Sequence, residues 1–143
     1  MSVSYWAIIG IGIDAERLYP YLNPVKCAEF LNKEQDDLHF TPEMCTEDKL
    51  QFYLRDLECP FEHFADMLTF CDDTDTLTFS TDECGDSYFY YPPSFPWDAV
   101  KNEPKSLEEV HQRIANAVNC LCDISREELE GLIDNDLYII CGA

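Results

Sequence analysis

Thiols and imidazoles are the side chains of this sequence that could supply a nucleophile and a base. There are eight cysteines and three histidines, and Cys59 stands four residues before His63. A thiol beside a basic group can act as a nucleophile, but strongly negative surroundings raise the pKa of a thiol and disfavour the thiolate. We therefore predict that the protein is not an enzyme. A hydrolase with paired carboxylates stays open, because 29 acidic residues must place some pair close together.

The cysteine pattern predicts free structural thiols. The apolar stretch from Met1 to Ile13 has no Lys or Arg ahead of it, so we expect no secretory signal and a reducing compartment. No C-x-x-C spacing occurs. Cys120 and Cys122 fall in a predicted helix, where their side chains would point about 200° apart, which disfavours a structural zinc site. The eight cysteines are Cys27, Cys45, Cys59, Cys71, Cys84, Cys120, Cys122 and Cys141.

A glycine pattern near the N-terminus matches a dinucleotide-binding fingerprint. Gly10, Gly12 and Ala15 fit G-x-G-x-x-A after a predicted strand. Asp14 and Glu16 would repel a pyrophosphate there, and no further βαβ units follow. We therefore expect the two glycines to permit close packing on the strand or to mark a bulge.

The stretch from Asp72 to Glu83 has the length of a calcium loop. Its sixth position is Leu77, where an EF-hand requires glycine, so it does not fit that motif. Looser binding of a cation by clustered carboxylates remains an alternative function, namely a cation-responsive or metal-binding module. We predict no cofactor and name no metal ligand.

Charge is the most unusual property of the sequence. It has 29 acidic and 9 basic residues, a net charge of −20 over 143 residues. Repulsion of this size opposes compaction, yet a composition that is 46% hydrophobic and 13% aromatic predicts a folded core. We interpret residues 1–143 as a single acidic globular domain whose surface meets a basic partner. The scattered basic residues form no patch, so we expect no direct nucleic-acid binding.

The acidic residues are concentrated in the middle of the chain. Between Glu34 and Asp86 there are 16 acidic residues and only two basic ones, Lys49 and Arg55. One group surrounds a predicted hairpin, and Glu62 and Asp66 stand four apart on a predicted helix, about 6 Å along its axis. Phosphates along a DNA strand have a similar spacing. The predicted partner contacts are Asp72, Asp73, Asp75, Asp82, Glu83, Asp86, Glu58, Glu62 and Asp66.

The elements that must position these acids follow from capping and breaking signals. Asn23-Pro24, Ser106 with Glu109, and Ser125 with Glu128 each mark a helix start. The predicted elements are a strand over 3–13, a turn over 15–19 capped by Asp14 and interrupted by Pro20, helices over 23–33, 46–58 and 61–68, a hairpin of 76–81 and 87–91, a stiff segment over 92–97, helices over 106–122 and 125–133, and a strand over 137–141.

This order predicts an α+β fold. We expect about four strands in a mixed or antiparallel sheet, with a β-hairpin and with helices packed mainly on one face.

Two segments carry a resemblance to known proteins. Ser4–Ile13 and Tyr91–Trp97, the latter followed by Asn102–Lys105, resemble segments of small phage-encoded proteins. Size, acidity and lone-domain layout are similar to those of phage inhibitors of bacterial defence, which include anti-CRISPR proteins and DNA mimics that block restriction enzymes. The resemblance implies an inhibitor but assigns neither its target nor a functional residue.

Together these observations predict an inhibitor that acts by DNA mimicry. It would occlude the basic nucleic-acid-binding surface of a nuclease or CRISPR effector in the cytoplasm of a host cell, without contacting a membrane. We expect a monomer or a homodimer. A homodimer would need an apolar patch, and the candidates for it are Phe89, Tyr91, Phe95 and Trp97.

Overall fold

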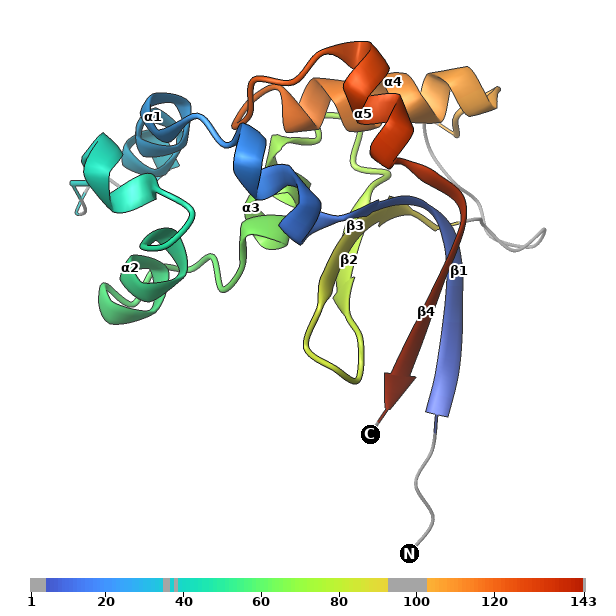
Figure 1. Ribbon diagram of the computed structural model, residues 1–143, viewed down its shortest axis with the longest axis horizontal. Coiled ribbons are helices and arrows are strands. Elements are labelled where there is room, and N and C mark those ends of the chain that lie inside the picture. The colour runs from blue at the N-terminus through green and yellow to red at the C-terminus, as the bar shows by residue number, and fades with distance from the viewer. Residues whose placement is uncertain (1–4, 35–36, 38, 93–102, 143) are drawn as a thin grey trace, which may run out of the picture.

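Four strands form one antiparallel sheet in the order β2-β3-β1-β4 (Figure 1). The computed structural model describes residues 5–34, 37, 39–92 and 103–142. The predicted α+β class, with a four-stranded sheet and a hairpin, is confirmed. The strands are β1 (Tyr5–Asp14), β2 (Thr78–Thr81), β3 (Ser87–Tyr91) and β4 (Asp134–Gly142).

Strand β1 pairs with β4 on one side and, from Ile11 onward, with β3 on the other. Gly12 lies opposite both Tyr90 of β3 and Asp134 of β4, and the register with β4 shifts between Gly10 and Gly12. A Cβ atom on Gly12 would lie 2.3 Å from both the carbonyl oxygen of Phe89 and the Cβ of Tyr90. Both expectations for these glycines, a bulge and close packing, are therefore confirmed.

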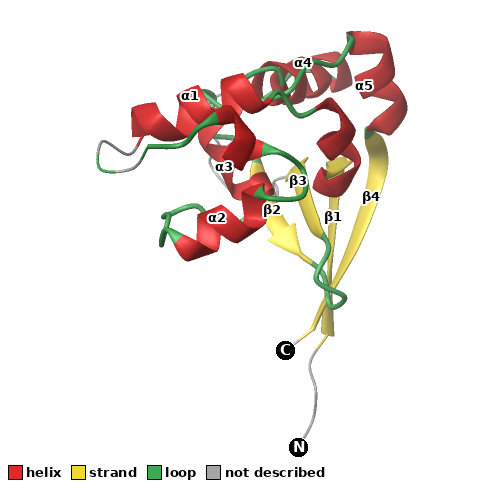
Figure 2. Cartoon of the chain, turned by 60° about the vertical axis from the view of Figure 1, so that its left-hand side comes forward, coloured by secondary structure: helices red, strands yellow, loops and turns green. Residues whose placement is uncertain are grey.

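The sheet is rolled so that its two edge strands meet. The N–H of Glu83, in the turn after β2, donates to the carbonyl of Ile140 in β4 (3.1 Å). The Cys141 thiol contacts the carbonyl of Thr81 (3.8 Å). Figure 2 shows the β1–β4 pair running away from the helices on the same side as the hairpin. A small core fills the inside of the roll, formed by Tyr90, Leu137, Ile139 and Cys141.

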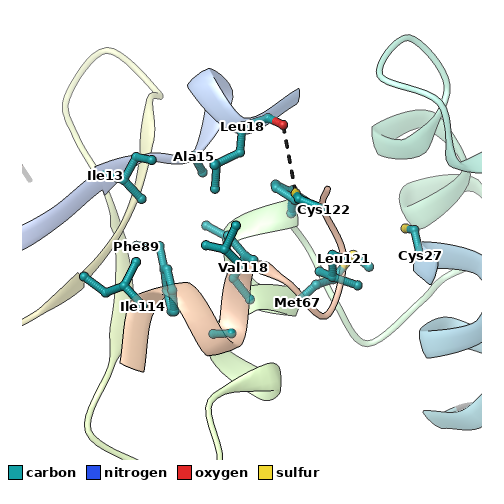
Figure 3. Packing of buried hydrophobic residues seen from close by; sticks show 14 of the residues in the cluster. Ile13, Ala15, Leu18, Cys27, Met67, Phe89, Ile114, Val118, Leu121 and Cys122 are labelled. Atoms are coloured by element: carbon teal, nitrogen blue, oxygen red, sulfur yellow. Dashed lines mark hydrogen bonds between the residues drawn. The ribbon is translucent and has the colours of Figure 1, made fainter. Parts of the chain in front are cut away.

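The helices and the opposite face of the sheet enclose the larger core. Figure 3 shows Ile13 and Phe89 of the sheet meeting Ile114 and Val118 of α4. The helical elements are η1 (Ala15–Tyr21, 3-10), α1 (Pro24–Glu34), η2 (Pro42–Cys45, 3-10), α2 (Leu50–Asp56), α3 (Phe64–Cys71), α4 (Leu107–Val118) and α5 (Arg126–Leu132).

The predicted helix caps are confirmed at three starts. The hydroxyl of Ser106 accepts from the N–H of Glu109 (3.1 Å), and the hydroxyl of Ser125 accepts from the N–H of Glu128 (3.1 Å). The amide oxygen of Asn23 accepts from two N–H groups of the first turn of α1. Each cap satisfies donors that a helix N-terminus leaves unpaired.

Several predicted boundaries are wrong. Helix α2 begins at Leu50 and not at Thr46, because the Thr46 carbonyl accepts from the N–H groups of both Lys49 and Leu50 and closes a separate turn. Pro20 lies inside η1 and does not interrupt it. Strand β4 begins at Asp134 rather than Leu137.

Helix α4 ends earlier than predicted, at Val118. The chain after it is drawn into tertiary contact, because the Leu121 carbonyl accepts from the N–H of Asn23 and the N–H of Asp123 donates to Tyr21. Cys120 and Cys122 therefore lie in a turn and not in a helix; Cys120 is exposed and Cys122 is buried.

One expectation about the surface also changes. Phe89 is fully buried and Tyr91 is nearly so, so neither can form the apolar patch of a homodimer; Phe95 and Trp97, like most of the stiff segment 92–97, lie outside the described residues. The described part of the chain contains no helix of the length and apolarity that crossing a membrane requires.

Candidate functional site

The acids that surround the hairpin form two groups and not one. Asp72, Asp73 and Asp75 precede β2, whereas Asp82, Glu83 and Asp86 follow it. The four residues of β2 separate the groups by at least about 10 Å. A single partner contact over all six carboxylates would have to span the length of the hairpin.

Asp72 holds its own loop together. One carboxylate oxygen accepts from the N–H and the hydroxyl of Thr74 (3.0 and 2.6 Å), and the other accepts from the N–H groups of Thr76 and Leu77 (3.0 and 2.9 Å). Arg113 of α4 donates to the Thr76 hydroxyl (3.1 Å) and fixes the loop against the helices. Asp73 and Asp75 remain exposed.

Replacing Asp72 with alanine is expected to lower the free energy of unfolding by about 2–4 kcal/mol, because four donors lose a charged acceptor. Urea denaturation of the purified variant measures this change. Asp73→Ala is the matched control, and its effect should stay within about 0.5 kcal/mol because that side chain is exposed. Equal stability of the two variants would contradict the structural role of Asp72.

The turn of the hairpin is built on Asp82. One oxygen of this carboxylate accepts from the N–H groups of Cys84 and Asp86 (both 2.9 Å), and the other accepts from the hydroxyl of Tyr88 (3.1 Å). Gly85 supplies the positive φ of 90° that the turn requires. Glu83 is left exposed in the same turn.

Two acids outside the predicted partner contacts, Asp14 and Glu16, lie near this turn. Asp14 lies opposite Tyr88 in the β1–β3 register, and Glu16 follows two residues later. Partial desolvation raises the pKa of the Glu16 carboxyl, and the charges of Asp86, Asp14 and Asp82 raise it further. Burial and the bond to Asp82 likewise raise the pKa of Tyr88 to about 12. We call Asp14, Glu16, Asp82 and Asp86 the turn cluster.

A groove runs from the turn cluster along α2. Two adjoining cavities of about 370 and 330 Å³ share Gln51, Arg55 and His63 in their lining. The larger is also lined by Gly85 of the hairpin turn. We call the two cavities together the α2 groove. Its lining includes four exposed carboxylates, those of Glu16, Glu47, Glu58 and Glu62.

Glu62 and Asp66 do not form the predicted row along a helix. Helix α3 begins at Phe64, so Glu62 precedes it. The carboxylate of Asp66 instead accepts from the N–H of Glu62 (3.2 Å) and closes the start of the helix. Glu58 has a positive φ of 52° and lies where the chain leaves α2. Glu58 and Glu62 both line the smaller cavity. They lie close together because of how the chain folds between α2 and α3, and not because of helical spacing.

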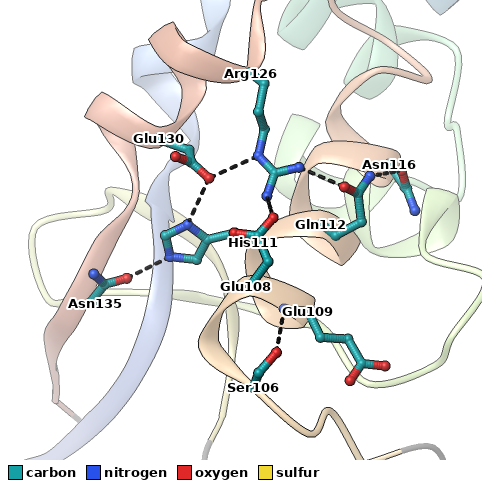
Figure 4. A network of polar contacts seen from close by, with 9 residues as sticks. All are labelled: Ser106, Glu108, Glu109, His111, Gln112, Asn116, Arg126, Glu130 and Asn135. Atoms are coloured by element: carbon teal, nitrogen blue, oxygen red, sulfur yellow. Dashed lines mark hydrogen bonds and ion pairs between the residues drawn. The ribbon is translucent and has the colours of Figure 1, made fainter.

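The ion pairs of the described residues lie elsewhere, on α1, α4, α5 and the turn after α4. Arg126 contacts Glu108 and Glu130 (2.8 and 3.0 Å), and His111 lies between Glu130 and Asn135 (Figure 4). The other pairs are Lys26 with Asp123 and Arg113 with Glu109. Within the described ranges, none of the four groove glutamates makes an ion pair or a side-chain hydrogen bond.

The geometry gives little support to a Cys59–His63 nucleophile or to a metal site. Cys59 and His63 both line the smaller cavity, but burial raises the pKa of the Cys59 thiol. Among residues 5–34, 37, 39–92 and 103–142, no three His, Cys, Asp or Glu side chains converge as metal ligands do. The eight cysteines are free thiols.

Neutralising Glu16 with glutamine is expected to stabilise the protein at neutral pH. A carboxyl with a raised pKa in the folded state lowers stability once it ionises, and this penalty disappears below its unfolded pKa. The melting temperature should therefore rise on the order of 1 °C at pH 7 and low salt. No rise is expected near pH 4.

Thermal melts at both pH values measure this effect. Glu29→Gln is the control, because Glu29 is an exposed glutamate of α1 outside the turn cluster. A gain that is as large at pH 4 as at pH 7, or equal in both variants, would show that repulsion in the turn cluster is not its cause.

Comparisons of the chain with protein-family models, with curated proteins and with solved structures find no match.

Proposed function

We propose that this protein is an inhibitor whose acidic surface occupies the nucleic-acid-binding surface of a basic protein. The proposed contact surface consists of the α2 groove and the adjacent hairpin turn. It includes Glu58, Glu62, Glu83 and Asp86 from the residues expected from the sequence, and adds Glu16 and Glu47.

One observation carries the proposal: in the part of the chain that the structure describes, no ion pair neutralises the groove glutamates, although Arg55 lines both cavities. Lys26, Arg113 and Arg126 pair with acids of α4 and of the turn after it, outside the α2 groove. The groove glutamates are exposed and line two adjoining cavities that a partner's side chains can enter. Unpaired like charges destabilise a fold, so their concentration on one surface favours a role in binding.

The proposed mechanism is competitive occlusion. Carboxylates of the groove would take the places of phosphates on the partner's Lys and Arg side chains, and the charge of −20 would accelerate association. Arg55 and His63 line both cavities, so a partner that enters either cavity would meet them beside the groove acids. Binding should weaken steeply as salt rises.

The partner class follows from this chemistry. A nuclease or a CRISPR effector presents a basic channel that normally holds nucleic acid, and the proposal places the inhibitor in the cytoplasm of the cell that contains it. Asp82 and Asp66 would support the surface, because their carboxylates accept from N–H groups of the hairpin turn and of Glu62. Asp72 holds the loop before β2 and is not part of the proposed surface.

The experiment that tests this function is an affinity pull-down of the tagged protein from bacterial lysate at low and high salt, identified by mass spectrometry. The proposal expects enrichment of one nucleic-acid-binding protein that added DNA displaces. Unselective capture of ribosomal and other basic proteins would contradict it. Capture that depends on added calcium and is insensitive to DNA would instead favour the cation-responsive alternative.

A further inference from the structure

A buried histidine lies at the junction of α4, α5 and β4. His111 of α4 is only 9% exposed. Its Nε2 lies 2.7 Å from the side-chain oxygen of Asn135 in β4, and its Nδ1 lies 3.4 Å from a carboxylate oxygen of Glu130 in α5 (Figure 4). One ring therefore connects α4 to the two elements that follow it. The proposed function uses none of these three residues.

Both ring nitrogens of His111 face oxygen atoms. A neutral imidazole has one N–H group and can donate to only one of the two oxygens, whereas a protonated imidazole has two N–H groups and can donate to both. In a neutral ring, the lone pair of the other nitrogen would face the Glu130 carboxylate or the Asn135 oxygen and be repelled by it. The geometry therefore matches a protonated ring.

The charges at the junction also favour a cation on the ring. The charged groups there are Glu108 of α4, Arg126 and Glu130 of α5, and Asp134 and Asp136 on either side of Asn135 in β4. Acids thus outnumber the single guanidinium. Hydrogen bonds from Arg126 and from His111 lower the pKa of the Glu130 carboxyl, so Glu130 stays ionised over the pH range in which histidine titrates.

We propose that His111 is a pH-sensitive switch, which holds α4 against α5 and β4 when its ring is protonated and loosens this junction when the ring loses its proton. The protonated ring donates to Glu130 and to Asn135 together. After the proton passes to water, only one of these bonds survives and the other contact becomes repulsive. The switch lies outside the α2 groove, so it is separate from the proposed inhibitor surface.

The stability that this contact contributes should fall as pH rises. The protonated ring makes both contacts only in the folded chain, so its contribution is complete at pH 5.5, below the ordinary titration range of histidine at about pH 6.5. The contribution is lost as pH rises through that range towards pH 8. Glu130 remains an anion at both pH values, so the change belongs to the imidazole.

The test is urea denaturation of the full chain and of His111→Gln at pH 5.5 and at pH 8. The substitution should increase the equilibrium constant for unfolding at least about fivefold more at pH 5.5 than at pH 8, because the protonated ring alone makes the second, charged bond. Partial exposure of Glu130 limits the effect. His39→Gln is the matched control, since His39 is exposed, and its effect should be the same at both pH values.

Two further measurements do not need a folded His111→Gln protein. The ring nitrogens of His111 in the wild-type protein, observed by NMR at pH 5.5, should both be protonated. Glu130→Gln should remove most of the pH dependence of stability that the wild type shows in this range, because an amide can either donate to the ring or accept from it.

Two results would overturn the proposal. One is an equal effect of His111→Gln at pH 5.5 and at pH 8. The other is a neutral ring at pH 5.5 that keeps one nitrogen without a proton. Both are measured on the protein alone, so they are independent of whether the proposed inhibitor function is correct.

Discussion

Reversing four groove glutamates to lysine, in the variant Glu16→Lys, Glu47→Lys, Glu58→Lys and Glu62→Lys, is expected to weaken partner binding at least 100-fold, or about 3 kcal/mol. Each substitution replaces an attraction to the partner's cations with a repulsion, and each such change is worth about 1 kcal/mol or more. These side chains are exposed, so the fold should survive. Titration against the captured partner at low salt measures the change.

A matched control separates this surface from the total charge. The variant Glu29→Lys, Glu103→Lys, Glu127→Lys and Asp136→Lys changes the net charge by the same amount, at exposed acids outside the α2 groove. Its affinity should fall less than 10-fold, and the difference between the two variants should shrink at high salt. Equal losses of affinity in both would mean that the partner responds to overall charge and that the groove is not the site.

Replacing Gly12 with alanine is expected to lower the free energy of unfolding by about 3 kcal/mol or more. The added methyl group would lie 2.3 Å from the Phe89 carbonyl oxygen and from the Cβ of Tyr90. Both atoms belong to or adjoin the backbone of β3, so they cannot withdraw without separating β3 from β1. That pairing joins the hairpin to the rest of the sheet.

Gly131→Ala is the matched control for this prediction. Gly131 lies in α5, and a Cβ atom there meets nothing within 4 Å. The same chemical change should therefore stabilise the protein by about 0.5–1 kcal/mol, since alanine favours a helix more than glycine does. Chemical denaturation of the two variants gives both values. A Gly12→Ala protein as stable as the wild type would refute the close approach of β1 and β3.

Local signals explain why much of the fold was predictable. Ser106 and Ser125 bond within their own first helical turns, and the hairpin forms between neighbouring segments. The end of α4 was misplaced for the opposite reason. Residues about 100 positions away hold that turn, as in the bond from the N–H of Asn23 to Leu121, and no local propensity reveals such a contact.

The candidate site was predictable only in composition. The excess of acid and its concentration in the middle of the chain were visible in the sequence. The sequence could not show that Asp14 faces Tyr88, because that depends on the register between two distant strands. Nor could the sequence show that the carboxylates of Asp72 and Asp82 bond to the backbone of their own loops. An acid that stabilises a turn and an acid that contacts a partner are the same residue type, and a single sequence does not distinguish them.

The meeting of the edge strands bears on how the protein behaves when it is concentrated. Open strand edges present rows of backbone donors and acceptors that can recruit strands from other molecules and start fibrous aggregates. Here the carbonyl of Ile140 on the outermost strand already accepts from the N–H of Glu83. This matters because Ile9, Tyr138 and Ile140 expose apolar surface on β1 and β4. The hairpin turn thus occupies a backbone acceptor near the end of β4. It opposes the addition of a strand from another molecule there, although the exposed apolar side chains would favour such contact.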